Sequence, residues 1–479
     1  MINNKQYYLD IFNVTEKDMT RLTSEGLKGG GDFCDLYFEN TSYRDLLLRD
    51  GEVTSGGFHI DYGVGIRVLS GEKTGYAYSE STDMQSMLSA AKAAAAITTG
   101  CAVSADRRTS DHRHFGKPNP AADRYPMRLD WREADMSAQL PVLKKLEQSI
   151  RSKDGRVIKV IAKLSSQVSD ILMYNSFEEI KYDTRPLGSL VASVVFSQNG
   201  KVENKSVSRS FRCGCEMITD ELLEEMACEA VNGLDARFEA KRPKGGGMPV
   251  VLGAGASGIL LHEAMGHAFE ADFNRKGQSV FSDRIGSRIC PEGITIVDDG
   301  TIHGNRGAVN YDDEGVPGQY TAMVEDGILT SYLHDRISAN YYGVAPTGNG
   351  RRESFRYMPL PRMRATYMES GEGKAEDIIA SVRKGIFVDE FTNGQVKIGE
   401  GDFTFYVKSG WLIENGRRTM PVKDINIIGN GPQALADIQA VADDLKIDDG
   451  TWTCGKVQSV PVSCGMPTVL VKNLTVGGE

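Results

Sequence analysis

Two histidines and a glutamate that could bind and use a metal ion lie within six residues of the chain, as His262, Glu263 and His267. The residues around them are apolar at helical spacing, which predicts a helix. A histidine followed by a glutamate, with a second histidine nearby, is typical of a zinc-activated water with an adjacent general base. The sequence therefore indicates hydrolytic metal chemistry. The alternative is that the two histidines are unrelated residues of one helix.

The spacing of the two histidines constrains the backbone between them. In the common His-Glu-x-x-His helix the histidines are four residues apart and share one face. Here they are five residues apart, and on a regular helix the second would point about 140° away from the first. Joint binding of one ion therefore predicts that the helix ends, or contains a π-type turn, near Gly266, where such a distortion costs least.

A catalytic zinc ion needs a third protein ligand, and the sequence offers several candidates. Spacing alone does not choose among them. They are Glu270, Asp272, His303, the run Asp312–Glu314, and Cys454 in a glycine-containing loop.

A glycine pattern overlaps the histidine segment and indicates a different chemistry. Gly253, Gly255 and Gly258 form a GxGxxG motif after an apolar run and before the expected helix, which is the setting of a dinucleotide-binding turn. A nucleotide-binding oxidoreductase is therefore an alternative function. However, residues 272–288 are polar and loop-like, so no apolar strand ending in an acidic residue follows at the required distance of about 20 residues. We interpret these glycines as turn and packing residues.

Length, charge and cysteine content bound the class of protein. The chain has 479 residues, which predicts two or three domains. Its formal net charge of −10 argues against a general affinity for nucleic acid or an anionic membrane. No apolar run is long enough to span a bilayer, and the first residues lack the apolar core of a signal peptide, so we expect a cytoplasmic location. Eight widely spaced cysteines predict reduced thiols and no disulfide framework.

The order of the expected elements predicts an α+β fold with two regions. Residues 1–235 form an N-terminal α/β-sandwich-like region, with a possible subdivision at a surface connection near 102–126. Residues 236–247 include a basic run rich in proline and glycine, which predicts a linker. Residues 248–479 predict a mainly antiparallel β domain that carries the helix with His262 and His267.

Turn residues and apolar periodicity mark individual elements of both regions. Two separate strands are expected over residues 157–164 and 171–175. Hairpin turns are predicted at Asn199-Gly200, Asp299-Gly300, Asp326-Gly327 and Asn415-Gly416, and a helix over residues 433–445 is expected to begin after Pro432.

Several stretches of the chain match a known family closely. They are Leu261–Gly277, Tyr311–Tyr320, Thr347–Glu353, Thr453–Lys456 and Thr475–Gly478. In these stretches, and over most of its length, the chain resembles the TldD/TldE (PmbA) family of zinc metallopeptidases, and within that family the TldD type of subunit. Matches this long and numerous do not arise by coincidence.

The resemblance implies a ligand set, a reaction and a partner. His262, His267 and Cys454 inherit the role of zinc ligands, and Glu263 inherits the role of general base in peptide-bond hydrolysis. The resemblance also implies an N-terminal α/β part and a β-rich C-terminal part that encloses the site at a dimer interface. The partner would be a TldE/PmbA-like subunit or a second copy of the chain. Substrates would be unfolded or extended peptides, including precursors of microcin-type peptides and labile antitoxins.

Two features depart from the family pattern without touching the ligands. The run Arg362–Thr366 differs in sequence, which puts local substrate contacts in doubt, and Cys464 is an additional thiol.

A zinc-dependent peptidase is the predicted function, and a noncatalytic scaffold is a third class, against which the intact histidine motif argues. Because a peptidase for many unfolded sequences must bind the peptide backbone, we also expect an exposed strand edge near the site.

Overall fold

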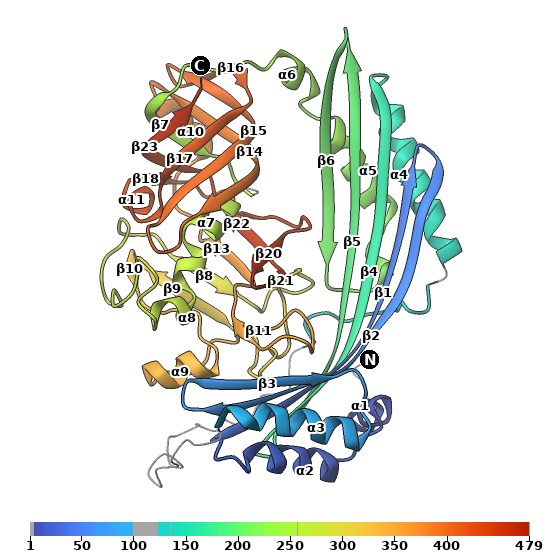
Figure 1. The fold of residues 1–479 in the computed structure, drawn as a ribbon. Helices are drawn as coiled ribbons and strands as arrows, with labels where there is room; N and C mark the ends of the chain where they lie inside the picture. The colour runs from blue at the N-terminus through green and yellow to red at the C-terminus, as the bar shows by residue number, and fades with distance from the viewer. Residues whose placement is uncertain (1–3, 99–122, 135, 256, 479) are drawn as a thin grey trace.

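Six long antiparallel strands form one sheet in the N-terminal half of the chain (Figure 1). The structure is a computed structural model that describes residues 4–98, 123–134, 136–255 and 257–478. In spatial order the strands are β3 (Lys73–Ser79), β2 (Glu52–Ser70), β1 (Phe33–Arg49), β4 (Val157–Asn175), β5 (Ile180–Gln198) and β6 (Lys201–Phe211). The two strands expected over residues 157–164 and 171–175 are one strand, β4. Alternating burial and pairing with β1 and β5 continue through the polar residues between them.

Helices cover one face of this sheet along its length (Figure 1). At one end lie α1 (Lys5–Phe12), α2 (Glu16–Leu27) and α3 (Met84–Ala95), and at the other lie α4 (Met136–Lys153) and α5 (Asp220–Val231). Side chains of a strand alternate between its two faces. Leu36 and Leu48 of β1 are therefore buried under the helices, whereas Tyr37 is buried on the opposite face with Phe355 from the C-terminal half.

A closed barrel of five strands forms one part of the C-terminal half. Around the ring these strands are β7 (Gly246–Leu252), β23 (Val469–Gly477), β17 (Ile425–Asn430), β15 (Asp402–Glu414) and β14 (Lys384–Val396), which pairs again with β7. The β14–β7 pair is parallel, and the other pairs of the ring are antiparallel. β16 (Arg417–Val422) and β18 (Ile438–Val441) add to the outside of the ring, on β15 and β23.

A second sheet lies beside the barrel, and the histidine helix packs between the two. In order this sheet contains β10 (Ile328–Leu329), β9 (Tyr320–Glu325), β8 (Ile296–Asp299), β13 (Ala365–Met368), β22 (Ser463–Met466) and β19 (Lys446–Ile447). Helix α7 (Gly258–Ala264) contacts β13 and β22 of this sheet and β14 of the barrel. A β-carbon on Gly258 would lie 2.5 Å from the backbone nitrogen of Gly465, so glycine is required for this close packing. One apolar core runs through the barrel, α7 and the second sheet.

Short elements complete the described part of the chain. They are the helices α6 (Leu234–Glu239), α8 (Ala271–Asn274), α9 (Arg336–Tyr342), α10 (Ala375–Ser381) and α11 (Gly431–Ala436), the pair β11 (Gly350–Arg351) and β12 (Leu360–Pro361), the hairpin β20 (Thr453–Lys456) and β21 (Gln458–Pro461), and the 3-10 turns η1 (Ala96–Thr98), η3 (Cys215–Met217) and η4 (Gly266–Phe269). The predicted mixture of helices and strands, with strands predominating, is confirmed. The division into residues 1–235, 236–247 and 248–479 stays a prediction, and most of the connection near 102–126 lies outside the described residues.

Three of the four predicted hairpin turns are confirmed. Both residues of each turn have positive φ, which a type I′ turn requires, at Asn199-Gly200, Asp326-Gly327 and Asn415-Gly416. The turn predicted at Asp299-Gly300 is wrong, because the Asp299 carboxylate accepts the backbone N–H of Thr301 and starts a loop that reaches to residue 319. The helix predicted over 433–445 is also wrong in length. α11 ends at Ala436, and the next residues pair with β23 as β18.

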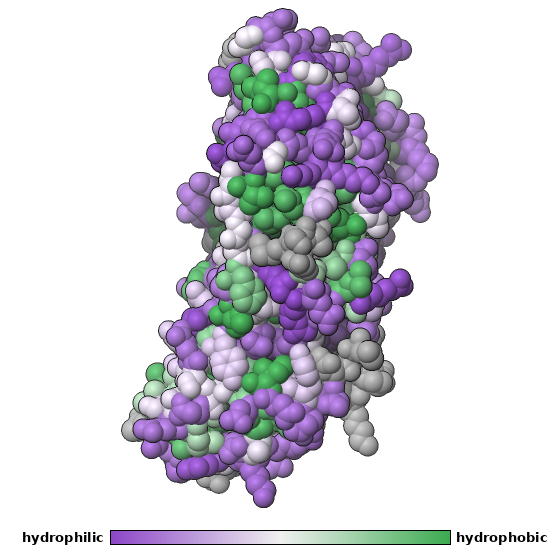
Figure 2. Space-filling view, turned by 90° about the vertical axis from the view of Figure 1, so that its right-hand side faces the viewer, coloured by the Kyte–Doolittle hydropathy of each residue, from purple (hydrophilic) through white to green (hydrophobic). Residues whose placement is uncertain are grey.

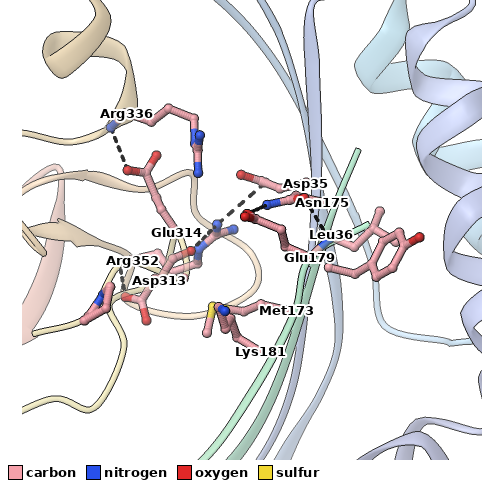
Figure 3. A pocket seen from close by; sticks show the side chains of 13 residues that line it. Asp35, Leu36, Met173, Asn175, Glu179, Lys181, Asp313, Glu314, Arg336 and Arg352 are labelled. Carbon is pink, nitrogen blue, oxygen red and sulfur yellow. Dashed lines mark hydrogen bonds and ion pairs between the residues drawn. The ribbon is translucent and has the colours of Figure 1, made fainter. Parts of the chain in front are cut away.

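Buried ion pairs fasten the sheet to the C-terminal half. In Figure 3, Asp313 and Glu314 extend from a loop of the C-terminal half toward Asp35 on the sheet. Arg67 of β2 is fully buried and pairs with Asp35 and with Glu314, the latter at 2.6 Å between Nη1 and Oε1. Arg185 of β5 pairs with Asp313 at 2.5 Å. The cavity among these side chains has a volume of about 30 Å³, room for about two water molecules, so it is a packed junction and not a substrate pocket.

The face of the molecule shown in Figure 2, which is the right-hand side of Figure 1, is mainly polar. Hydrophilic side chains cover most of the face shown in Figure 2, and the apolar side chains there form separate patches. Among the helices of the described residues, none is long and apolar enough to cross a membrane.

Candidate metal centre

The histidine helix breaks where the sequence predicts it. Helix α7 ends at Ala264, Met265 has φ −131° and ψ −46°, and the 3-10 turn η4 begins at Gly266. A β-carbon on Gly266 would lie 2.2 Å from Sδ of Met363, so the chain passes this close only because the residue is glycine. The predicted departure from regular α geometry near Gly266 is confirmed. It allows the His262 and His267 rings to lie 5.3 Å apart between centroids, at an angle of 80°.

The hairpin of β20 and β21 adds a thiol to the two histidines. Cys454 lies in β20, 187 residues after His267, and its Sγ is 3.3 Å from Nε2 of His267. One ligand atom each from His262, His267 and Cys454 lies within 4.8 Å of the others. All three side chains are buried, with exposed fractions of 0%, 4% and 1%. The structure therefore brings together the three residues for which the sequence predicted metal binding.

The surroundings of His262 fit a metal ion. Among the described residues, neither ring nitrogen of His262 has a hydrogen-bond partner outside the cluster with His267 and Cys454, although the side chain is fully buried. Burying unpaired polar nitrogens is unfavourable, and such atoms normally have a partner. Two imidazoles and a thiolate are donors that zinc binds well, and three protein ligands leave one coordination position open. These three residues could therefore hold a metal ion and leave one of its positions open.

Charges around the cluster favour the thiolate form of Cys454. Burial alone would raise the pKa of its thiol, but the imidazoles of His262 and His267 lower the pKa to about 4. Burial would lower the pKa of His267, but Glu270 and Cys454 raise it to about 10. Burial would raise the pKa of Glu270, but Lys456 and His267 lower it to about 2. The thiolate is the form of cysteine that binds metals.

Glu263 is the more exposed member of the motif. Its side chain keeps 27% of its surface exposed, and its Oε2 lies 3.9 Å from Nε2 of His267. The carboxylate is therefore placed beside the cluster and in contact with solvent. A general base must reach both the reacting proton and the bound substrate, and this location suits that role.

The remaining ligand candidates lie outside the cluster. Glu270 and Asp272 follow η4, but Glu270 faces Nδ1 of His267, the ring nitrogen opposite Cys454, at 2.9 Å. The carboxylates of Asp313 and Glu314 pair with arginines at the sheet junction of Figure 3, and His303 is exposed.

Two buried cations of the site were missed by sequence reasoning. Lys456 binds Glu270 at 3.0 Å, and Arg362 lies 3.6 Å from the other oxygen of that carboxylate. Lys456 lies in a stretch that matches the family pattern, and Arg362 lies in one that departs from it. Neither stretch predicts a contact with Glu270, because a single cation in a loop has no characteristic spacing. Only the folded chain shows that both approach one carboxylate.

The glycine motif has the structural role inferred for it. Gly255 has a φ of 91°, which favours glycine, and Gly258 packs on the backbone of Gly465. β7, the strand before the motif, lies between one parallel and one antiparallel neighbour in the barrel. A dinucleotide-binding turn requires a parallel βαβ unit, so the oxidoreductase alternative lacks the fold it needs.

A large cleft separates the long sheet from the barrel. Its volume is about 790 Å³. It is lined by residues of β6, by α5 and α6, by β14 and β15, and by the segment from Lys446 to Trp452. Trp452 stands two residues before Cys454, and β6 is an edge strand whose partner in the described chain is β5. The end of β6 nearest this segment is already bonded, because Ser210 donates its backbone N–H to the carbonyl of Asp449 at 2.7 Å and Phe211 forms a β-bridge with Asn305. The cleft therefore joins the rest of the β6 edge to the segment that carries the thiol.

Comparison with known proteins gives three domain matches, all from one family. Residues 34–98, 130–237 and 245–478 match the PmbA/TldA metallopeptidase domain 1, central domain and C-terminal domain. A protein of Haemophilus influenzae named metalloprotease TldD homolog is 40% identical over 93% of both chains. A zinc metalloprotease TldD homolog of Saccharolobus solfataricus is 36% identical over 50% of this chain and 54% of its own.

Solved structures share the fold at lower sequence identity. A Thermotoga maritima protein described as a modulator of DNA gyrase has a TM-score of 0.76 and 22% identity, with 96% of this chain and 100% of that chain covered. TldE from Thermococcus kodakarensis has a TM-score of 0.71 and 19% identity over the same shares of the two chains. At these identities the likeness concerns the fold alone.

Proposed function

Because the chain belongs to the PmbA/TldD family of metallopeptidases, we propose that it is a zinc-dependent peptidase that hydrolyses unfolded or extended peptides. His262, His267 and Cys454 hold the metal, and Glu263 is the general base. The observation that carries this proposal is the buried cluster of three ligand atoms within 4.8 Å, in which His262 has no other partner among the described residues.

Each residue of the motif has a separate task in peptide hydrolysis. Glu263 takes a proton from the attacking water and passes it to the leaving amine, for which its partly exposed carboxylate is suitably placed. The buried imidazoles and thiolate present three ligand atoms within 4.8 Å of one another. When bound there, zinc polarises the scissile carbonyl and makes a water more acidic.

The cleft beside the barrel is the proposed peptide site. An extended peptide can add as a strand to the part of the β6 edge before Ser210, where main-chain hydrogen bonds are the same for nearly every sequence. A folded substrate has its own strands paired and cannot bind in this way. A TldE/PmbA-like subunit or a second copy of the chain would narrow the access to the cleft. Such a partner would also cover the unpaired strand edge, which is an aggregation hazard when it is exposed. To test this mode of binding, the same sequence is offered once as a flexible peptide and once inside a stable folded domain. Only the flexible form should be cleaved, and equal cleavage of both forms would contradict strand addition.

A cysteine peptidase is a second candidate, favoured by one contact. Cys454 Sγ lies 3.3 Å from His267 Nε2, and Glu270 binds the other nitrogen of the ring, which is the order of a nucleophile, a base and an orienting acid. That arrangement leaves His262 without a task, and Sγ lies in a residue only 1% exposed. A zinc chelator would leave such an enzyme active, whereas iodoacetamide would inactivate it.

Metal content and cleavage, measured on the same variants, test the proposal. His262→Ala, His267→Ala and Cys454→Ala should each lose zinc and activity, because a ligand supplies metal affinity. Glu263→Ala should keep zinc and lose cleavage, because the general base acts on the water and not on the ion. Zinc retained in Cys454→Ala would remove the cysteine from the ligand set. Cleavage retained in Glu263→Ala would contradict the base, and a chain that binds zinc but cleaves no peptide would support the scaffold alternative.

A further inference from the structure

A buried carboxylate behind the metal cluster has no task in the mechanism above. Glu270 is fully buried, and its Oε2 lies 2.9 Å from Nδ1 of His267. Its backbone is fixed as well, because Glu270 forms a β-bridge with Leu333. The carboxylate therefore approaches His267 from a rigid position, on the side of the ring away from Cys454.

One cation, Lys456, is hydrogen-bonded to this carboxylate, and a second, the buried Arg362, lies in ion-pair range of it. Lys456 Nζ donates to Glu270 Oε2 at 3.0 Å, to Asp272 Oδ1 at 2.7 Å and to the carbonyl of Pro361 at 3.2 Å. Arg362 Nε lies 3.6 Å from Glu270 Oε1. A buried carboxylate without paired charges would be strongly destabilising, and these partners make its burial possible.

One of these cations also holds the thiol ligand. Arg362 is fully buried and donates to the backbone carbonyl of Cys454 at 2.7 Å and to that of Gln458 at 2.9 Å. The two carbonyls belong to the two strands of the hairpin that carries Cys454. Arg362 thus joins the carboxylate behind one proposed ligand to the backbone of another.

The hydrogen bond to Glu270 decides which nitrogen of His267 is available. A metal binds the neutral imidazole, so binding releases one of the two protons that the raised pKa of His267 keeps on the ring. The carboxylate at Nδ1 keeps the remaining proton there. Nε2 then has its lone pair free to bind a metal, and it is the nitrogen that faces Cys454. Without the carboxylate, both tautomers are populated and the ring is free to rotate.

We propose that Glu270, fixed by Lys456 and Arg362, is a positioning residue that holds His267 with Nε2 directed at the metal and couples this ring to the hairpin of Cys454. This inference rests on the proposed zinc site. It assigns Glu270 to the support of a ligand and not to the ligand set. Partners of this kind change metal affinity by about 10–100-fold when they are removed.

The test is the zinc affinity of the full chain, measured by competition with a chromophoric chelator. Glu270→Gln keeps the size of the side chain but removes the charge, and it should weaken zinc binding by about 10–100-fold. The Co²⁺-loaded variant should also show shifted visible absorption bands, because the ligand geometry changes while the ligand atoms stay the same. A merely structural role would lower the unfolding temperature without moving these bands.

A matched control removes another carboxylate, one that contacts the hairpin of Cys454 from outside. Glu353 is exposed and accepts the backbone N–H of Ser459 in β21 at 2.6 Å. Glu353→Gln should leave zinc affinity and the cobalt bands unchanged. If Glu270→Gln fails to fold, ¹⁵N spectra of the zinc-loaded wild-type chain carry the test. They should show His267 with its proton on Nδ1, and zinc bound through Nδ1 would overturn the inference.

Parallel measurement of His262→Ala separates the two ways of failing. If His262→Ala loses zinc while Glu270→Gln keeps full affinity and unchanged cobalt bands, only the role of Glu270 is overturned. If both variants keep full zinc affinity, the proposed centre itself is wrong. Loss of zinc in His262→Ala together with weaker, spectrally altered binding in Glu270→Gln supports both.

Discussion

Glu39 should make the stability of the protein fall as the pH rises toward neutrality. Its carboxyl is buried in β1, where it accepts hydrogen bonds from the Thr41 hydroxyl and the Phe355 backbone N–H, each at 2.7 Å. Burial is the largest cause of a raised pKa, which the nearby Asp313 and Asp61 raise further, and the two hydrogen bonds only partly oppose it. The pKa rises from its ordinary value of 4.5 to about 7.

The sign and size of the effect follow from proton linkage. Between about pH 4.5 and pH 7 the folded protein binds a proton at Glu39 that the unfolded chain has lost. The stabilisation is fully present below pH 4.5 and is lost as the pH rises through about 7. A shift of this size corresponds to about 3 kcal/mol. Glu39→Gln cannot ionise, and its amide can donate to Thr41, whose hydroxyl hydrogen is then free to donate to Ser169, 2.8 Å away.

The assay is denaturant unfolding of wild type and Glu39→Gln across pH 5 to 8. The difference between the two curves is the measured quantity, because Asp312 and Asp335 also have raised pKa values, about 7 and 6, from burial. The variant should gain up to about 3 kcal/mol relative to wild type at pH 8 and little at pH 5. Thr41→Val is a control with the opposite effect on the pH dependence. Losing the hydrogen bond from Thr41 should raise the pKa of Glu39 further and enlarge the loss of stability between low and high pH. A difference independent of pH would refute this reasoning.

Three further substitutions have defined outcomes. Arg67→Met should lower the free energy of unfolding by about 3–5 kcal/mol, because it leaves two buried carboxylates without their cation; an unchanged denaturation midpoint would contradict this. Gly266→Ala should weaken zinc binding in a titration, because its β-carbon would meet Met363 and displace the turn, and a second change, Met363→Ala, should restore part of the affinity. Val457→Asn should raise the unfolding temperature by relieving about 1 kcal/mol of strain, because this exposed, β-branched residue has a φ of 63°. A lower unfolding temperature would contradict that last prediction.

Local signals in the sequence were sufficient for several parts of the fold. Asn199-Gly200 forms the expected turn because its φ values depend on the two residues themselves. The break near Gly266 was predictable because the five-residue spacing allows joint ligation only if the helix is interrupted. These inferences depend on neighbours in the chain, where the constraint and its cause lie close together.

Other parts depend on contacts that no local pattern records. The residues after Ala436 read as helix, but pairing with β23 makes them a strand, because tertiary contacts outweigh helix propensity. Cys454 was one of several ligand candidates in the sequence, and only the family resemblance selected it, since it lies 187 residues from His267. Glu270 was weighed as a ligand because it is close in sequence, yet the fold places it behind the His267 ring. Its cations arrive from other loops.

The ligand set is tested most directly by X-ray absorption at the zinc edge of the metal-loaded chain. The account predicts one sulfur scatterer at about 2.3 Å and two imidazole nitrogens at about 2.0–2.1 Å, with a further light atom at the open position. The sulfur should disappear in Cys454→Ala. A zinc site with no sulfur scatterer in the wild-type chain, or a chain that cleaves peptides without bound metal, would contradict the proposed centre.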